Sequence, residues 1–316
     1  MKNIFEKLTV SAAVVAALVS CQKAQVEKEY NLTVYAAEAP ETAEAPETAE
    51  VTTTKTHLDN SRNVLWDSSS EKMRIFCASD KDAKPAYADS ENATLSDGGK
   101  KATFSFNLVT AYDKYIYGGI YPSSAVSEAS QFSRVRVLLP STQHPTASTY
   151  DPAAFIMVAK PDPQTFDEAQ TKLNMWFRKV VALNKVTFTD LNFATDEKVD
   201  SVKFTIPFMF AGGQYFSLAS GDALDYDQMA RDASNIITLV YDTPFTISNG
   251  TFDAWFTSWE VSIAGGESFE VEIVTNKAKY TRILYPYGAD MITFKEGKFN
   301  PLGLKMGSEK ITRTEL

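Results

Sequence analysis

The feature that most constrains the fold of this chain is its succession of short β-type segments divided by turn dipeptides. The segments are rich in Val, Ile, Thr, Phe and Tyr, and they recur at roughly 8–12-residue spacing without alternating helices. Examples are KMRIFCAS (residues 72–79), SVKFTIPFMF (201–210) and NIITLVYD (235–242). This pattern predicts an all-β, antiparallel chain built of β-sandwiches.

Glycine-containing dipeptides predict where strands turn back on themselves. Residues 93–108 read as a hairpin that turns at Asp97-Gly98-Gly99, and residues 245–256 read as one that turns at Asn249-Gly250. Asn-Gly is the strongest two-residue hairpin signal, because both residues tolerate a positive φ.

The β-type segments form two series, which predicts two domains in tandem. Residues 140–163 contain five of the thirteen prolines of the chain, too many for a central strand. We therefore expect an N-terminal sandwich over residues 29–168 and a C-terminal sandwich over residues 169–316.

The N-terminus has the character of a bacterial export signal. Lys2 and Lys7 precede an apolar run from Leu8 to Val19, which is shorter than the about 20 residues that a membrane-spanning helix needs. Leu18-Val19-Ser20-Cys21 resembles a lipobox, in which cleavage falls before a cysteine whose thiol is acylated. We therefore predict a signal peptide over residues 1–20, cleavage between Ser20 and Cys21, a lipid anchor on Cys21 and a short tether over residues 21–28. The alternative is an ordinary secretory signal with an incidental cysteine.

Charge and cysteine content exclude several classes of function. The formal net charge is −9, and removal of residues 1–20, which carry two lysines and one glutamate, makes it −10. Such a chain has no electrostatic attraction to a phosphate backbone, so nucleic-acid binding is not expected. With Cys21 acylated, Cys77 is the only remaining thiol. We expect Cys77 to be a buried small side chain, and neither a disulfide nor a cysteine metal site can form within one chain.

A strand and an acidic repeat follow the predicted tether. Tyr30, Leu32 and Val34 alternate with polar residues, which indicates a strand. EAPETA then occurs at 38–43 and again at 44–49. This composition cannot bury enough apolar surface to offset its ordering entropy, so we expect a disordered acidic loop over residues 38–50.

Three stretches of the chain resemble the fimbrillin-like lipoproteins of Bacteroidetes, of the major and minor fimbrial subunit type. In the first stretch, residues 52–76, Thr54-Lys55-Thr56 precedes a polar loop, Leu65-Trp66 and a strand that ends in Ile75-Phe76. A Gly-Asp pair follows the Trp in many relatives, whereas this chain has Asp67-Ser68. The other two stretches are FRKVVALNKVTF (177–188) and ITFKEGKFNPLGLKM (292–306).

The resemblance implies a specific fold and mode of assembly. It implies two tandem transthyretin-like antiparallel β-sandwich domains, export as an outer-membrane lipoprotein at the cell surface or in a fimbrium, and no catalytic residue or cofactor. In pilus-forming members an Arg- or Lys-specific protease removes an N-terminal segment, and a donor strand from another subunit fills the groove. EYNLTVY (29–35) is the corresponding candidate strand here.

The distribution of basic residues leaves the role in a pilus open. No Lys or Arg lies between Lys28 and Lys55, so the candidate cleavage site is Arg62. Without cleavage the chain would stay lipid-bound with its groove closed. A pilus subunit, an anchor and a free-standing adhesin with a ligand on a host or bacterial surface all remain open.

The residues that carry chemistry in enzymes are sparse. We expect both histidines, His57 and His144, to be solvated loop or strand-end residues, and no nucleophile or phosphate-binding motif occurs. Asp222, Asp225 and Asp227 form the densest acidic group, but their spacing is not that of an EF-hand, and we predict no metal site.

Two tryptophans support an alternative function. Trp255 and Trp259 would share one face of a single strand, and exposed aromatic rings can bind sugars. The alternative hypothesis is therefore a glycan-binding surface lipoprotein that uses these two rings as a platform. The competing interpretation is that both rings fill the core of the second sandwich.

Overall fold

The computed structural model describes residues 27–39, 57–58, 64–66, 72–162, 164–224, 232–247, 249–286, 291–307 and 311–315. Within these residues every regular element is a β-strand or a short 3₁₀ turn, so the all-β prediction is confirmed. The three turns are η1 (Asp97–Gly99), η2 (Ser123–Ala125) and η3 (Pro152–Ala154).

The first half of the chain is dominated by an eight-stranded sheet. In spatial order its strands are β5 (Ala86–Asp89), β4 (Arg74–Ala78), β8 (Ile116–Tyr121), β12 (Met157–Ala159), β13 (Lys172–Lys179), β1 (Lys28–Glu38), β7 (Lys101–Thr110) and β6 (Thr94–Ser96). The sheet curls, because the backbone N–H of Glu91, just after β5, donates to the carbonyl of Ser105 in β7 (3.0 Å). Trp66 fills its inner face, edge-on to Phe104 and Tyr121 at 5.5 and 4.9 Å between ring centroids.

The second half forms a sandwich of two facing sheets. The larger sheet contains β11 (Thr142–Gln143), β17 (Ile236–Thr246), β15 (Lys198–Thr205), β20 (Phe269–Thr275), β21 (Ala278–Leu284) and β24 (Thr312–Glu315). The smaller sheet contains β18 (Phe252–Ser258), β14 (Ala182–Thr189) and β23 (Phe299–Lys305). Phe204 of the larger sheet stacks on Phe256 of the smaller one, with 4.6 Å between ring centroids. Aromatic rings from both inner faces therefore form the core of the second half.

Three smaller groups of strands complete the fold. They are the sheet β16 (Gly212–Phe216), β10 (Arg134–Leu139) and β9 (Val126–Gln131), the pair β19 (Val261–Ile263) with β22 (Ile292–Phe294), and the pair β2 (His57–Leu58) with β3 (Val64–Leu65).

The two halves are joined by strand pairing and not by a linker alone. β10 of the first half pairs with β16 of the second, and β11 pairs with β17. β13 belongs to the eight-stranded sheet, so the chain changes sheet between Lys179 and Ala182, more than ten residues after the predicted boundary at 168/169. Whether 29–168 and 169–316 are separate folding units stays a prediction.

Strand pairing differs from the sequence expectation in two respects. Three of the strand pairs are parallel, β1 with β13, β14 with β23 and β11 with β17, although we expected antiparallel sheets throughout. Each of these pairs joins strands that lie far apart in the sequence, which leaves room for the long connection that a parallel pair requires.

Of the two predicted hairpins, one is confirmed and one is wrong. β6 and β7 pair across the turn at Asp97-Gly98-Gly99. Asn249 and Gly250 both have a positive φ, as predicted, but β17 and β18 on either side of them belong to different sheets. The dipeptide therefore turns a corner of the sandwich.

Candidate assembly groove around strand β1

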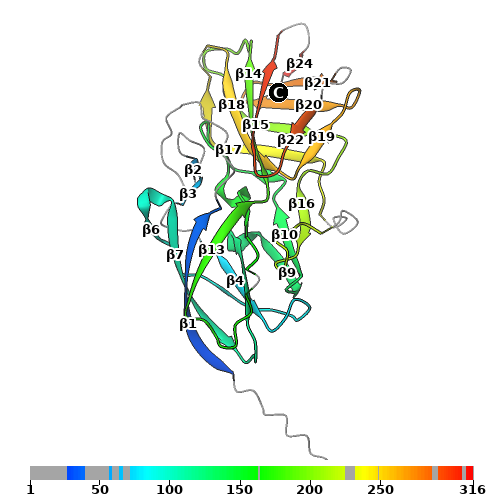
Figure 1. The fold of residues 1–316 in the computed structure, drawn as a ribbon. Coiled ribbons are helices and arrows are strands. Elements are labelled where there is room, and N and C mark those ends of the chain that lie inside the picture. Colours follow the sequence, from blue (N-terminus) through cyan, green and yellow to red (C-terminus); the bar gives the residue numbers. More distant parts are fainter. Residues whose placement is uncertain are drawn as a thin grey trace, which may run out of the picture.

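Strand β1 lies in the interior of the eight-stranded sheet, with a hydrogen-bonded neighbour on each side (Figure 1). It pairs antiparallel with β7, from Lys28 opposite Thr110 to Ala37 opposite Lys101. It pairs parallel with β13, from Thr33 opposite Lys172 to Glu38 opposite Phe177. The expectation that residues 30–36 are paired with neighbouring strands is confirmed.

The side chains of β1 alternate between the core and the outer face of the sheet. Leu32, Val34 and Ala36 are at most 1% exposed, whereas Asn31 and Tyr35 point outward. Burial of one aliphatic side chain of this size stabilises the folded chain by about 1.5–3 kcal/mol. Strand β1 is therefore held by a row of buried side chains as well as by backbone pairing.

Near the N-terminal end of β1, Tyr30 forms a cluster with a second tyrosine and a cysteine thiol. The hydroxyl of Tyr30 lies 3.2 Å from that of Tyr117 and donates to Sγ of Cys77 at 3.8 Å. Burial raises the pKa of both tyrosines and raises the pKa of Cys77 to about 12. Cys77 is a free, fully buried thiol, as the sequence predicts, and Tyr30 of β1 covers it.

An ion pair and a backbone bond hold the other end of β1. Nζ of Lys179 in β13 lies 2.8 Å from a carboxylate oxygen of Glu38, and both side chains are less than a fifth exposed. The N–H of Ala39 donates to the carbonyl of Phe177 at 2.7 Å. The strand is thus attached to the sheet at both ends.

The residues predicted for export and processing lie outside the described part of the chain. They are Ser20, Cys21 and Arg62, and most of the acidic repeat lies outside it as well, at residues 40–50. Signal cleavage, lipidation, proteolytic processing and a disordered loop therefore stay predictions. Among the described residues, no helix is both long and apolar enough to cross a membrane.

The alternative hypothesis of a platform formed by Trp255 and Trp259 on one strand face does not fit the geometry. β18 ends at Ser258, so the two residues do not share one strand face. Trp259 is 1% exposed, and its indole N–H donates to the carbonyl of Gly212 at 3.1 Å. Trp255 is half-buried, packed against Phe299 with Lys185 over its ring. No sugar ring can reach Trp259 from solvent.

Sequence reasoning missed a different pair of aromatic residues. Tyr35 on β1 and Trp176 on β13 are 44% and 52% exposed on the outer face of the eight-stranded sheet. The sequence KLNMWFRK (172–179) contains a signal for the exposure of Trp176. Leu173, Met175 and Phe177 alternate with polar residues and point inward, so Trp176 between them points outward. The sequence prediction places this segment at the beginning of the second domain and assigns no face to its residues.

The candidate titratable residues are engaged in local contacts. Nδ1 of His144 lies 2.9 Å from an oxygen of Asp242, on the surface. Asp222 lies 3.7 Å from Arg178, whereas Asp225 and Asp227 fall outside the described residues. Within the described ranges no group of three or more His, Cys, Asp or Glu side chains is arranged to hold a metal ion.

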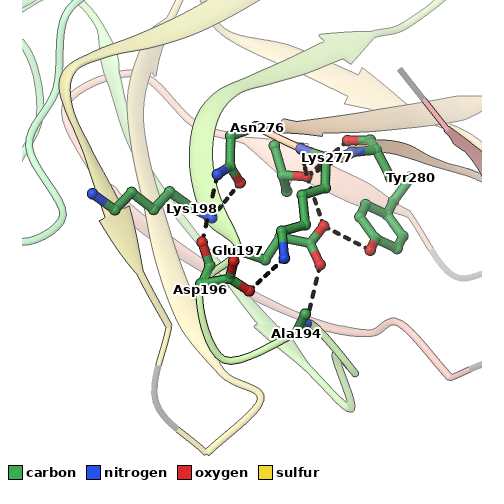
Figure 2. Close-up of polar contacts among 9 residues, drawn as sticks. Ala194, Asp196, Glu197, Lys198, Asn276, Lys277 and Tyr280 are labelled. Atoms are coloured by element: carbon green, nitrogen blue, oxygen red, sulfur yellow. Dashed lines mark hydrogen bonds and ion pairs between the residues drawn. The ribbon is translucent and has the colours of Figure 1, made fainter.

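A buried polar cluster surrounds Glu197, which directly precedes β15 (Figure 2). Its carboxylate, on a residue that is 2% exposed, accepts hydrogen bonds from the N–H of Ala194, Oγ1 of Thr275 and the hydroxyl of Tyr280, at 3.1, 2.6 and 2.8 Å. Burial acts to raise the pKa of Glu197, but these bonds outweigh it, so the pKa lies below its ordinary value. Nε of Arg313 in β24 donates to the same tyrosine hydroxyl at 3.1 Å.

The cluster connects a loop, a turn and a strand of the second half. It ties the loop before β15 to the β20–β21 turn, where Asp196 pairs with Lys277 and the N–H of Lys198 donates to Asn276 at 2.8 Å (Figure 2). Through Arg313 it also reaches β24. A carboxylate held by three donors is stabilised as an anion, so it stays deprotonated near neutral pH and is a weak base.

Comparisons with known proteins identify similar solved structures only. No family model matches the sequence, and no curated protein does. The chain is similar to a candidate cell adhesion protein of Bacteroides fragilis, with 9% identity and a TM-score of 0.47 over 90% of this chain and 97% of that one. A candidate cell adhesion protein of Parabacteroides distasonis is similar at 12% identity and a TM-score of 0.45, over 91% of each chain.

A third similar structure is the fimbrial anchor protein Mfa2 of Porphyromonas gingivalis. Its identity is 11% and its TM-score 0.36, over 77% of this chain and 78% of that one. These solved structures are named as candidate cell adhesion proteins and as a fimbrial anchor protein.

Proposed function

We propose that this chain is a fimbrillin-like protein of the cell surface, without catalytic activity, that is anchored in the outer membrane by a lipid on Cys21. It associates with other fimbrial subunits by donor-strand exchange at the position of β1. Its role is that of a pilus subunit, an anchor or an adhesin. The observation that carries the proposal is the placement of β1, an N-terminal strand, in the interior of the eight-stranded sheet.

Departure of β1 would create a groove suited to another strand. Both β7 and β13 would lose the partner that lies between them and would present unpaired N–H and C=O groups on that side. Such an edge is a template for strand addition, since main-chain hydrogen bonds supply affinity for any extended segment. The buried positions of Leu32, Val34 and Ala36 would supply selectivity, because an incoming strand must carry apolar residues at alternate positions.

Processing decides which role the chain takes. Arg62 lies after β1 and after the acidic repeat, so cleavage there would separate β1 from the rest of the chain. An uncleaved chain would keep β1 in place and stay attached through Cys21, which suits an anchor or a free-standing adhesin. Mass spectrometry of the protein after treatment with an Arg-specific protease distinguishes these roles.

A displacement experiment tests strand exchange. A site for a sequence-specific protease is inserted within residues 44–50, so that the chain folds before it is cut. A fluorescent peptide with the sequence of Lys28–Glu38 is then added. We expect the peptide to be incorporated only after cleavage, and its Val34→Asp version not to be incorporated, because that change places a charge in the core.

The thiol of Cys77 supplies an independent readout. In the intact chain Cys77 is buried beneath Tyr30 and should react slowly with a maleimide. Cleavage followed by dilution should expose it, and the Lys28–Glu38 peptide should protect it again. If Cys77 stays protected after cleavage, or if both peptides are incorporated equally, β1 is not exchangeable and the assembly mechanism is wrong.

Lipidation is tested separately, by mass spectrometry of the protein from membranes of the native host. We expect the mature chain to begin at Cys21 and to carry fatty acyl chains, and Cys21→Ser to abolish membrane attachment. An unmodified N-terminus would overturn the anchor.

A further inference from the structure

A small cavity lies beside β13, next to the part of this strand that β12 does not reach. β12 pairs with β13 only from Ala159 opposite Phe177 to Met157 opposite Lys179. Beyond Lys160 the chain leaves β13, which opens a cavity of about 210 Å³ along the free edge of the strand. Its lining includes Tyr117, Lys160, Pro161, Asp162, Asn174 and Trp176.

The backbone of Asn174 faces this cavity. The carbonyl of Phe177 accepts a hydrogen bond from Ala39, just after β1, and the carbonyl of Trp176 accepts one from Lys160 on the opposite side. Because successive residues of a strand point their polar groups to alternate sides, those of Asn174 point to the same side as those of Trp176. No strand within the described residues pairs with Asn174 on that side.

One exposed aromatic ring borders the cavity. Trp176 lines it and is 52% exposed, and no other aromatic ring of the described residues is stacked on it. Tyr35 is its diagonal neighbour on β1, since Tyr35 is opposite Asn174 and Ala37 is opposite Trp176. Two of the outward positions near Tyr35, Thr33 and Ser105, are small and polar and are paired across β1 and β7.

We propose that this cavity, with Trp176 as its stacking surface, is a binding subsite for a neutral hexopyranose residue of a glycan. A pyranose ring has an apolar C–H face, which packs on an aromatic ring, and a rim of hydroxyls that need both donors and acceptors. The backbone and side-chain amides of Asn174 and the ammonium of Lys160 are the donors, and the carboxylate of Asp162 is an acceptor.

The size of the cavity and the charge around it restrict which class of ligand can bind. Pockets for drug-sized ligands span about 300–1,000 Å³. This cavity is smaller, so it suits one ring and not a strand of several residues. Lys160 and Asp162 offset each other, and the formal net charge of −9 disfavours polyanionic glycans.

The subsite does not depend on the fate of β1. No residue of β1 lines the cavity, so exchange of that strand would leave the binding groups in place. Failure of glycan binding would leave the assembly mechanism untouched, and the reverse also holds.

Saturation-transfer NMR with the mature chain tests the subsite. The probes are the methyl pyranosides of glucose, galactose and mannose, with methyl glucuronide as an anionic comparison. We expect at least one neutral glycoside to bind with a Kd on the order of 1 mM. Trp176→Ala should weaken binding at least about tenfold, which corresponds to about 1.4 kcal/mol, and Trp176→Phe should retain part of the affinity.

The matched control is Tyr285→Ala, which removes an aromatic ring that is 62% exposed and does not line the cavity. We expect it to bind as the unaltered chain does. Since Trp176 is on the surface, near-UV circular dichroism should show that Trp176→Ala is folded. The proposal is overturned if no neutral glycoside binds, if only the glucuronide binds, or if Trp176→Ala binds as the unaltered chain does.

Discussion

At the scale of single residues, the two faces of the sheet around β1 differ sharply in what they contribute. Leu32 points into the core and is 1% exposed, whereas Val109 on the neighbouring strand points outward and is 52% exposed. Leu32→Ala should lower the free energy of unfolding by about 2–5 kcal/mol, because it removes buried methyl groups and leaves a cavity. Val109→Ala should change it by less than about 0.5 kcal/mol. Urea unfolding measures both, and equal losses would contradict the inward placement of Leu32.

The lowered pKa of Glu197 makes the stability of the chain depend on pH. A carboxylate whose pKa is lower in the folded chain contributes stability that is present above its unfolded pKa and lost as the pH falls through its folded pKa. Glu197→Gln removes this contribution. We expect the difference in unfolding free energy between the unaltered chain and Glu197→Gln to be largest near neutral pH and to shrink on acidification below the ordinary glutamate range.

Comparison of the two proteins at each pH isolates Glu197 from Asp196 and Glu272, whose pKa values are also lowered. Both of those carboxylates remain in the variant, so their effects cancel in the difference. Denaturant unfolding between about pH 3 and pH 7 spans the relevant range. A difference that grows on acidification would mean that burial, and not hydrogen bonding, controls this carboxylate.

Individual residues differ in how far the sequence predicts their environment. The apolar surroundings of Cys77 predict its burial, since a lone cysteine in a strand behaves as a small apolar residue. The exposure of a tryptophan depends on where its strand ends and which sheet covers it. Trp259 lies in the core, as the competing interpretation expects, whereas Trp255 is half-buried and Trp176 is the most exposed of the four tryptophans.

At the scale of elements, an ion pair joins the C-terminal end of β1 to β13. Lys179→Ala would remove this 2.8 Å ion pair from the carboxylate of Glu38, whose side chain is 15% exposed. Such a loss costs more than the about 0–1 kcal/mol of an exposed ion pair. We expect faster amide hydrogen exchange over residues 36–39, measured by NMR or mass spectrometry, with little change at Leu32 and Val34.

A comparable ion pair elsewhere provides the control for this prediction. Lys185→Ala removes the 3.3 Å contact with Asp253 on the sheet of the second half. It should leave exchange in β1 unchanged. If Lys179→Ala has no more effect on residues 36–39 than Lys185→Ala has, backbone pairing alone holds the strand.

Strands were easier to predict than their partners. Alternating apolar residues identify β1, β7 and β13, because side chains on a half-buried strand repeat every two residues. Pairing depends on tertiary packing, which local signals do not encode. The Asn249-Gly250 turn adopts the backbone conformation that its residues favour, yet the strands around it diverge into two sheets.

At the scale of the whole molecule, the buried side chain of Gln143 is one of several contacts between the two halves. Gln143 in β11 is fully buried and bonds to the backbone of Thr257 in β18 in both directions. Its Nε2 donates to the carbonyl of Thr257 at 2.8 Å, and its Oε1 accepts from the N–H of that residue at 2.9 Å. The pairs of β10 with β16 and of β11 with β17 add backbone bonds between the halves.

These connections predict that the described halves unfold together. Amide hydrogen exchange, measured at increasing denaturant concentration, should show β7 and β20 losing protection in the same transition, although the sequence suggests two tandem domains. Gln143→Ala should lower the midpoint for both strands, because it leaves two backbone groups of Thr257 buried without a partner, at a cost of about 1–3 kcal/mol each. His144 is one residue away and exposed, so His144→Ala should lower the free energy of unfolding by at most about 1 kcal/mol. Two separate transitions in the unaltered chain, or an effect of Gln143→Ala on only one of the strands, would show that each sandwich folds by itself and that its neighbour merely rests against it.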